Sequence, residues 1–295
     1  MRSNVRRWPA VYATPSQAQS LRSAACELHL KDEALYDRHH QQEVVASLRD
    51  SAADGFDDVV GRMHAALNRA PWFTVVHGLP ADQGATLLVA LSATLGELVE
   101  PYRQKWSRVV RHITPSTDKL VSGHVLNEFL HTDGTDWPEP NDYTCLFCVR
   151  QDQRGEGRSR LLDLTSLMEG LTRSTDPGLA ARMMDRAVPW RVAGELGGGV
   201  HWAPVLRSHP TEIRWLRYTV ALTLGQGLAE LDAELAEDLA RFELAVEGLQ
   251  TVIDLTLRAG DLMVVGNRLC LHARTAIDDL AGSERELLRT KVKKG

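Results

Sequence analysis

Residues that commonly bind transition metals occur in two short segments of the sequence. NEFLHTDGTDW, residues 127–137, places His131 and Asp133 two positions apart. On a β-strand this spacing puts both side chains on one face, where they can reach one ion. Two protein ligands are too few for a tight site, but DLMVVGNRLCLHARTAI, residues 261–277, adds His272. The three residues together predict a metal site, whereas the pair alone is weak evidence because the chain has 11 histidines.

Two histidines and one carboxylate on one face of a metal are typical of non-haem Fe(II) oxygenases, which keep the opposite face open. A pair of arginines, Arg285 and Arg289, follows the second segment in the run RELLR. On a strand both guanidinium groups would face one side, and their planar forks suit carboxylates. Without the upstream motif, two solvated arginines near the chain end would be the preferred interpretation.

The ordered set of segments resembles the Fe(II)/2-oxoglutarate-dependent dioxygenases, in the branch of taurine dioxygenase and clavaminate synthase. The resemblance runs from about residue 72 to residue 290. It is carried by PWFTVVHGLP, LHTDGTDWPEPNDYTCLFCVR, GEGRSRLLDL, GGGVHWAPVL with IRWLRYTV, and GDLMVVGNRLCLHARTAI followed by RELLR.

The resemblance implies a role for each matching residue. His131, Asp133 and His272 match the iron ligands, which are the catalytic centre. Arg285 matches the arginine that binds the distal carboxylate of 2-oxoglutarate, and Ser159 stands where the family usually has a threonine touching that group. Arg289 matches an arginine that meets the anionic group of the prime substrate in several members, and Asn127 matches a substrate-contacting position. The segment PYRQKWSRVVRH, residues 101–112, and Trp137 are also expected to lie near the substrate, with ordinary packing as the alternative for the aromatic residues there.

The implied activity is an oxygenase that uses Fe(II), with 2-oxoglutarate and O2 as cosubstrates. The expected substrate is a small carboxylate-bearing molecule, an amino acid or derivative in specialised metabolism, hydroxylated at an aliphatic carbon. Desaturation and cyclisation remain alternatives. Halogenases of this superfamily lack the carboxylate ligand, so Asp133 disfavours that activity. A zinc hydrolase and a non-catalytic jelly-roll binding module are the alternatives of other classes.

Many short segments rich in β-formers, flanked by helical patterns, predict a β-sandwich or jelly roll backed by helices. The resemblance sharpens this to a double-stranded β-helix (jelly roll) core with flanking helices and a helical insert. We expect one domain over residues 1–295, with a mainly helical part at 1–70 and the jelly-roll core at 72–290.

Local patterns predict where the individual elements lie. Helical spacing predicts helices within residues 16–30 and 57–70, a third helix that stops before Pro101, and a long one at about 228–247 with a solvated acidic face. Strands are predicted at PWFTVVHGLP, SRVVRHITP, DYTCLFCVR, SRLLDL, IRWLRYTVAL, TVIDLTL and DLMVVGN.

Composition excludes several classes of protein. A net charge of −5 gives no general affinity for nucleic acid or anionic membranes, and no apolar run is long enough to span a bilayer. The four cysteines do not form a disulfide framework, which favours a reducing, cytoplasmic location. Cys145 and Cys148 are expected to be two buried core residues on opposite strand faces. A small-molecule substrate is the expected partner, and homo-oligomer formation is left open.

Overall fold

The structure is a computed structural model that describes residues 8–28, 37, 39–52, 54–100, 109–115 and 128–295. The first part of the chain contains β1 (Ala10–Tyr12), α1 (Pro15–Glu27), α3 (Gln41–Ala52), α4 (Asp54–Leu67), β2 (Phe73–His77), α5 (Gly84–Ala93), β3 (Glu97–Leu98) and β4 (Arg111–Ile113). The middle contains β5 (Tyr143–Arg150), β6 (Ser159–Asp163), α6 (Leu164–Thr172), α7 (Leu179–Asp185), β7 (Ala187–Arg191), β8 (Val200–Pro204), β9 (Leu206–Ser208), β10 (Thr211–Ile213), α8 (Arg217–Gly225) and α9 (Ala233–Gly248). The last part contains β11 (Ile253–Leu255), β12 (Leu262–Gly266), β13 (Cys270–Arg274) and β14 (Glu286–Lys293).

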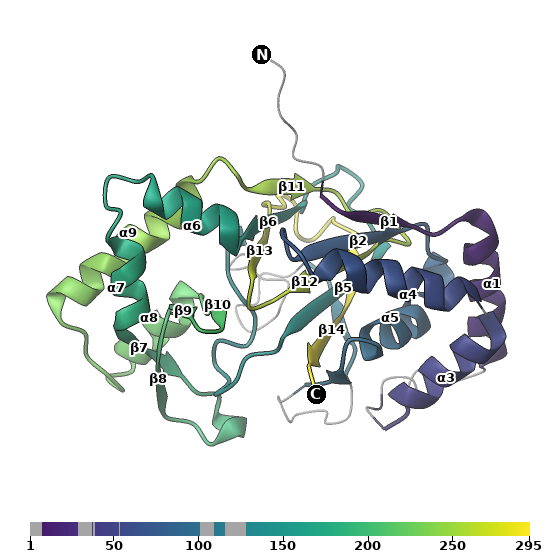
Figure 1. The fold of residues 1–295 in the computed structure, drawn as a ribbon, viewed down its shortest axis with the longest axis horizontal. Helices are drawn as coiled ribbons and strands as arrows, with labels where there is room; N and C mark the ends of the chain where they lie inside the picture. Colours follow the sequence, from purple (N-terminus) through teal and green to yellow (C-terminus); the bar gives the residue numbers. More distant parts are fainter. Residues whose placement is uncertain (1–7, 29–36, 38, 53, 101–108, 116–127) are drawn as a thin grey trace, which may run out of the picture.

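Two sheets form the centre of the molecule (Figure 1). The larger one has seven strands in the order β1-β2-β12-β5-β14-β3, with β4 also paired to β14. The smaller one has the order β11-β6-β13. Both are built mainly from antiparallel pairs, so residues along each strand alternate between two faces. The strands predicted at β2, β4, β5, β6, β11 and β12 are confirmed.

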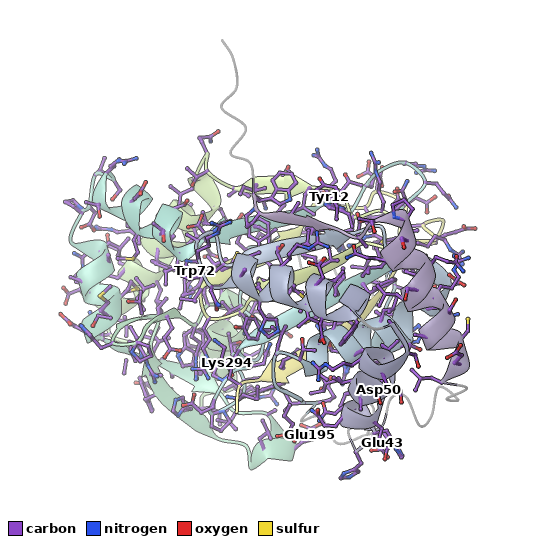
Figure 2. The ribbon with its side chains drawn as sticks, turned by 45° about the vertical axis from the view of Figure 1, so that its right-hand side comes forward. Tyr12, Glu43, Asp50, Trp72, Glu195 and Lys294 are labelled. Carbon is purple, nitrogen blue, oxygen red and sulfur yellow. The ribbon has the colours of Figure 1, made fainter. Side chains whose placement is uncertain are left out.

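The outer face of the large sheet is covered by α1, α3, α4 and α5 (Figure 1). Cys145 and Phe147 of β5 point toward these helices and are fully buried among their aliphatic side chains. Glu43 and Asp50 of α3, labelled in Figure 2, lie on its exposed side. Helices α1 and α3 bury one apolar side and expose the other, whereas α5 is buried on nearly all sides.

The inner face of the large sheet packs against the smaller sheet. Cys148 of β5 and Leu287 of β14 meet Leu161 of β6 and Cys270 of β13 in one buried cluster. Cys145 and Cys148 therefore face opposite sides of one strand, as predicted, and the four cysteines are free thiols. The functional cavity described below lies along this inner face.

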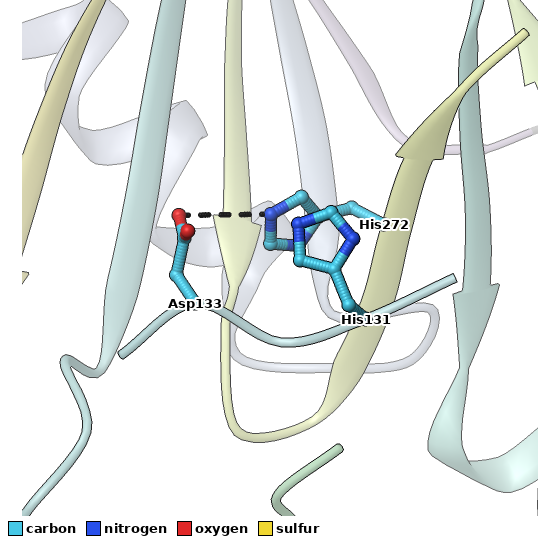
Figure 3. A group of neighbouring side chains, drawn as sticks. All are labelled: His131, Asp133 and His272. Carbon is cyan, nitrogen blue, oxygen red and sulfur yellow. Dashed lines mark ion pairs between the residues drawn. The ribbon is translucent and has the colours of Figure 1, made fainter. Parts of the chain in front are cut away.

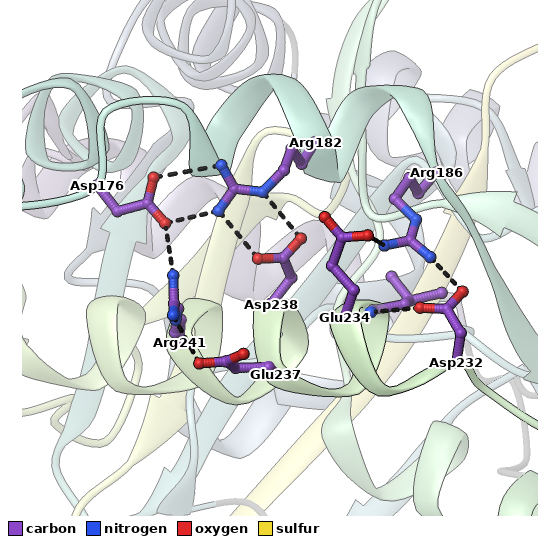
Figure 4. Close-up of polar contacts among 9 residues, drawn as sticks. Asp176, Arg182, Arg186, Asp232, Glu234, Glu237, Asp238 and Arg241 are labelled. Carbon is purple, nitrogen blue, oxygen red and sulfur yellow. Dashed lines mark hydrogen bonds and ion pairs between the residues drawn. The ribbon is translucent and has the colours of Figure 1, made fainter.

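A helical insert, α6 to α9 with the small strands β7 to β10, lies at the other side of the molecule (Figure 1). The long helix α9 begins later than predicted, because the side chain of Asp232 accepts a hydrogen bond from the Leu235 amide and caps it. Its acidic face is only partly solvated. Asp238 is buried and accepts two 2.9 Å hydrogen bonds from Arg182 of α7, within the ion-pair network of Figure 4.

Two other predicted elements were wrong in type or length. IRWLRYTVAL is not a strand throughout, since β10 ends at Ile213 and α8 begins at Arg217. The β-branched Thr219, Val220 and Thr223 are the buried residues of α8, which packs against β7, so packing overrides local propensity.

The helix predicted to run up to Pro101 ends at Ala93, and β3 follows. Gly96 lies between them with a φ of +152°, and a Cβ there would stand 2.1 Å from the Lys293 carbonyl oxygen of β14. The chain must leave the helix at this point because β3 pairs with the end of β14.

Among the described residues, no helix combines the length and the apolar character needed to cross a membrane.

We predict that Phe242→Ala destabilises the protein by about 3–5 kcal/mol, because a buried aromatic ring is replaced by a cavity. Phe242 is fully buried in α9 and meets the edge of the Trp215 ring at a centroid distance of 4.9 Å. Chemical denaturation measures the change in the free energy of unfolding. Leu244→Ala is the matched control on the same helix, because Leu244 is 74% exposed; equal losses for the two variants would contradict the packing described here.

Candidate metal centre

The three predicted ligands converge on one point of the inner cavity (Figure 3). Ligand atoms of His131, Asp133 and His272 all lie within 4.8 Å of one another. His272 Nε2 is 3.6 Å from Asp133 Oδ2, and the two imidazole centroids are 4.7 Å apart. Both histidines are buried. Two imidazoles and a carboxylate at these separations are a donor set that suits a divalent transition metal.

Backbone pairing brings the two histidines together. His131 and His272 exchange both amide hydrogen bonds, at 3.0 and 2.8 Å, in an isolated antiparallel bridge. His272 belongs to β13, whereas His131 is an isolated bridge residue, so the strand geometry considered for the pair does not extend to Asp133. Asp133 instead lies in a turn that continues through Gly134, whose φ of +67° strongly favours glycine.

Asn267, directly after β12, fixes the backbone of Asp133. Its Oδ1 accepts from the Asp133 amide at 2.7 Å, and its Nδ2 donates to the Asp133 carbonyl at 3.0 Å. The same Nδ2 donates to the Asn141 carbonyl at 2.9 Å. Sequence reasoning gave this buried asparagine no role, because nothing near it in the sequence reveals its contact with Asp133, 134 positions away.

Hydrogen bonds also orient the ligand atoms themselves. His131 Nδ1 is 2.8 Å from the Phe129 carbonyl oxygen, so this nitrogen donates and Nε2 is left as a metal-binding lone pair. Thr144 Oγ1 of β5 donates to Asp133 Oδ2 at 2.8 Å. The Nδ1 of His272 is buried and has no hydrogen-bond partner among the described residues.

Charges and burial set the protonation of the site. Burial, and next the proximity of His272, lowers the pKa of His131 to about 4, which leaves its ring neutral at pH 7. Burial alone would raise the pKa of Asp133. The nearby cations Lys291 and Arg289 outweigh it and hold that pKa well below its usual range. The imidazole of His131 and the carboxylate of Asp133 are thus in the forms that bind metal.

The cavity that contains the triad is also lined by a buried arginine, Arg285. Arg285 and Ser159 line the same cavity as the three ligands, and both are buried. Burial, and next the charge of Arg274, lowers the pKa of Arg285 to about 10. No described residue gives the Arg285 guanidinium a hydrogen bond or ion pair. A buried guanidinium without a counter-ion is costly, so this end of the cavity is suited to an anionic ligand.

The predicted substrate-facing residues have different positions. Arg289 of β14 lines the cavity, and its Nη1 is 3.6 Å from Asp133 Oδ1. Trp137 is buried and is not one of the residues that line the cavity, and its ring lies 4.7 Å from the Nζ of Lys291. Asn127 lies outside the described residues, as do residues 101–108 of the segment thought to approach the substrate.

Sequence reasoning missed two cations near the site. Lys291 has its Nζ 3.6 Å from Asp133 Oδ1, and Arg274 lines the cavity with its Nη1 3.3 Å from Glu128 Oε1. Both could have been found from strand periodicity, since Lys291 is two positions beyond Arg289 and Arg274 two beyond His272.

A larger hollow of about 740 Å³ lies beside α6, and it contains none of the triad residues. Its wall is mostly apolar, with Leu164, Met168 and Leu269 among its residues. Size alone therefore does not locate the chemistry, and the smaller cavity with convergent charged groups is the candidate site.

We predict that Asn267→Ala weakens metal binding about 10- to 100-fold, because the residue that positions a ligand is lost. Calorimetric titration of the metal-free protein with Co(II) measures this. Asn68→Ala, at an exposed asparagine beyond α4, is the control and should bind Co(II) like the parent. Equal affinities for Asn267→Ala and the parent would mean that Asp133 is held without this side chain.

We also predict that the metal-free protein loses stability as the pH falls from about 6.5 toward 4. A histidine whose pKa is 6.5 in the unfolded chain and about 4 in the fold takes up its proton on unfolding, so acid favours the unfolded state. Its contribution is at most about 1.4 kcal/mol per pH unit. His131→Gln should remove this component, so unfolding free energies at pH 7 and pH 5 should differ less than in the parent. An identical pH slope for both proteins would contradict a buried neutral His131.

Solved structures of similar fold are iron oxygenases. An asparagine oxygenase in complex with Fe(II), hydroxyasparagine and succinate has a TM-score of 0.73 at 19% identity, covering 97% of this chain and 93% of the other. The non-heme iron oxygenase OrfP with Fe and alpha-ketoglutaric acid has a TM-score of 0.73 at 16% identity, covering 98% and 95%. OrfP with Fe, succinate and (3S)-hydroxy-L-Arg gives 0.71 at 18%, covering 97% and 94%. At these identities the likeness shows the fold, a mixed α and β architecture.

No curated protein matches the sequence. Residues 37–291, however, match the family described as taurine catabolism dioxygenase TauD, TfdA family. The matched range covers most of the chain and contains the triad together with Ser159, Arg285 and Arg289. The chain therefore belongs to the TauD/TfdA family of dioxygenases.

Proposed function

We propose that the protein is an Fe(II)- and 2-oxoglutarate-dependent oxygenase that hydroxylates an aliphatic carbon of a small carboxylate-bearing substrate. The observation that carries the proposal is the combination of the triad with the unpaired, buried Arg285 in one cavity. A metal site alone would fit several chemistries. An anion-binding arginine facing it fits a metal-chelating dicarboxylate.

His131, Asp133 and His272 would hold the iron. Their donor set fits Fe(II), because two imidazoles and one carboxylate on one side of the ion are the ligands of the non-haem oxygenases. When bound, Fe(II) together with 2-oxoglutarate supplies the activation of O2, with conversion of the cosubstrate to succinate and CO2. The protein contributes position and charge.

Arg285 and Ser159 would bind the distal carboxylate of 2-oxoglutarate. The guanidinium offers two parallel donors and the hydroxyl a third, so the far end of the cosubstrate is fixed and its other end is directed at the triad. The low exposure of both residues keeps water away from this contact, which strengthens it.

Arg289 would bind an anionic group of the prime substrate, since its guanidinium lines the cavity close to Asp133. An amino acid or an amino-acid derivative in specialised metabolism is the proposed substrate class. The asparagine oxygenase and OrfP structures support it, because those proteins are recorded with hydroxyasparagine and hydroxyarginine. Asn127 and Trp137 stay predictions as substrate-contacting residues.

Further expectations from the sequence, about fold, reaction outcome, location and oligomer formation, belong to the same proposal. The two packed sheets would be the two sides of a jelly roll, and the whole chain one domain. Desaturation or cyclisation of the same substrate would need only a different placement of its C–H bonds. A cytoplasmic location stays a prediction from cysteine usage, and homo-oligomer formation stays open.

The test is binding of 2-oxoglutarate to the Fe(II)-loaded protein without oxygen. We expect a weak visible charge-transfer band, and we expect succinate to form with O2 when the correct amino acid from a library is present. His272→Ala should abolish the band. Arg285→Ala should weaken 2-oxoglutarate binding at least about 30-fold, because a buried charge pair is lost.

Arg150→Ala is the matched control, since Arg150 is an exposed arginine at the end of the neighbouring β5, paired with Glu284. It should bind 2-oxoglutarate like the parent. The absence of both the band and succinate would overturn the proposal. Hydrolysis supported by Zn²⁺ would then favour the zinc hydrolase. The absence of any turnover would favour the non-catalytic binding module.

A further inference from the structure

Lys291 is a buried cation beside the proposed iron ligand Asp133. Lys291 is only 4% exposed, although lysine is among the residue types most rarely buried. On β14 it follows Arg289 on the same strand face, so the two cations approach Asp133 from one strand. The Nζ of Lys291 and the Nη1 of Arg289 each lie 3.6 Å from the same oxygen, Asp133 Oδ1.

The two oxygens of Asp133 therefore have different surroundings. Oδ2 accepts the Thr144 hydroxyl at 2.8 Å and is the oxygen that faces His272, at 3.6 Å. In these contacts, the neighbours of Oδ1 are two cations, Arg289 and Lys291. Oδ1 is called the outer oxygen of Asp133, and the two cations share its charge.

The two cations differ in their access to the cavity. Arg289 is part of the cavity wall, whereas Lys291 is not among the residues that line it. The ammonium of Lys291 lies over the Trp137 ring, 4.7 Å from its centroid, which favours its position beside Asp133. Burial lowers the pKa of Lys291, and among the carboxylates that oppose this effect Asp133 is the strongest, ahead of Glu100 and Asp136.

We propose that Lys291 is the permanent counter-ion of the outer Asp133 oxygen and leaves Arg289 available for an anionic group of the substrate. This inference rests on the proposed function. With Lys291 in place, Arg289 can turn to a substrate carboxylate while Asp133 keeps a positive neighbour. Without it, substrate and Asp133 would compete for one guanidinium. Lys291 is thus a positioning residue and does not itself touch the reacting groups.

The inference has a consequence for metal binding that needs neither cosubstrate nor substrate. Thr144, Asn267 and Arg289 all still hold Asp133 when Lys291 is changed. Removing the ammonium therefore leaves the ligand in place and takes away one positive charge close to a dication. Coulomb repulsion at a few ångströms in a partly buried site is large, so affinity for a divalent metal should rise, on the order of 10-fold.

The experiment titrates the metal-free protein with Co(II) by calorimetry. Lys291→Met, which keeps the length of the side chain without its charge, should bind Co(II) about 10-fold more tightly than the parent. Lys291→Arg keeps the charge and can stack on Trp137, so it should restore the parent affinity. Unchanged or weaker binding by Lys291→Met overturns the proposal. If that variant fails to fold, Lys291→Gln is judged by the same criterion.

A second measurement uses the amino acid that most stimulates succinate formation. Lys291→Met should raise its KM about 10-fold while the KM for 2-oxoglutarate, bound at Arg285, changes less than about twofold. A rise in both KM values would indicate a general structural defect and contradict the proposed role. The two proposals fail separately: no 2-oxoglutarate binding by the parent refutes the oxygenase, while an unchanged Co(II) affinity of Lys291→Met refutes the role of Lys291.

Discussion

The burial of one carboxylate, Asp133, is the constraint on which the rest of the site depends. An ionised group taken out of water needs counter-charges and hydrogen bonds, or it takes up a proton and loses its charge. Lys291 and Arg289 supply the charge, and Thr144 and Asn267 supply the hydrogen bonds. All four partners lie on β5, on β14 or directly after β12, so the large sheet serves as the frame of the site.

The smaller sheet completes that frame from the other side. His272 is presented by β13, and its backbone bridge to His131 ties the turn that carries Asp133 to the second sheet. The helical insert supports the same turn, because the Trp215 amide and carbonyl bond to Thr132 and the Trp215 ring packs on Phe242 of α9. Packing of the Trp215 ring on Phe242 therefore contributes to the position of the turn that carries Asp133.

Six strands, β2, β4, β5, β6, β11 and β12, could be predicted from the sequence because alternation and β-forming residues are local signals. The convergence of the triad could be predicted from the ordered set of motifs along the chain. The turn at Asp133 and the helix at Arg217–Gly225 could not, since burial against distant elements decides them. Asn267 shows the limit clearly: it bonds to a residue 134 positions away, and nothing near it in sequence reveals that partner. Lys291 lies in a basic chain end, but its alternation with Arg289 on one strand face is a local signal that could have placed it beside the site.

The protonation of the site adds a last constraint on what it binds. Metal ligands usually lose protons when the ion enters, but here burial already keeps His131 neutral and two cations already keep Asp133 ionised. The same cations repel a divalent metal. Among the described residues that line the cavity, Asp133 is the one carboxylate, whereas Arg274, Arg285 and Arg289 are three cations. Arg274 also forms an ion pair with Glu128. The cavity therefore carries excess positive charge that anionic ligands neutralise, so metal and anions should strengthen each other's binding.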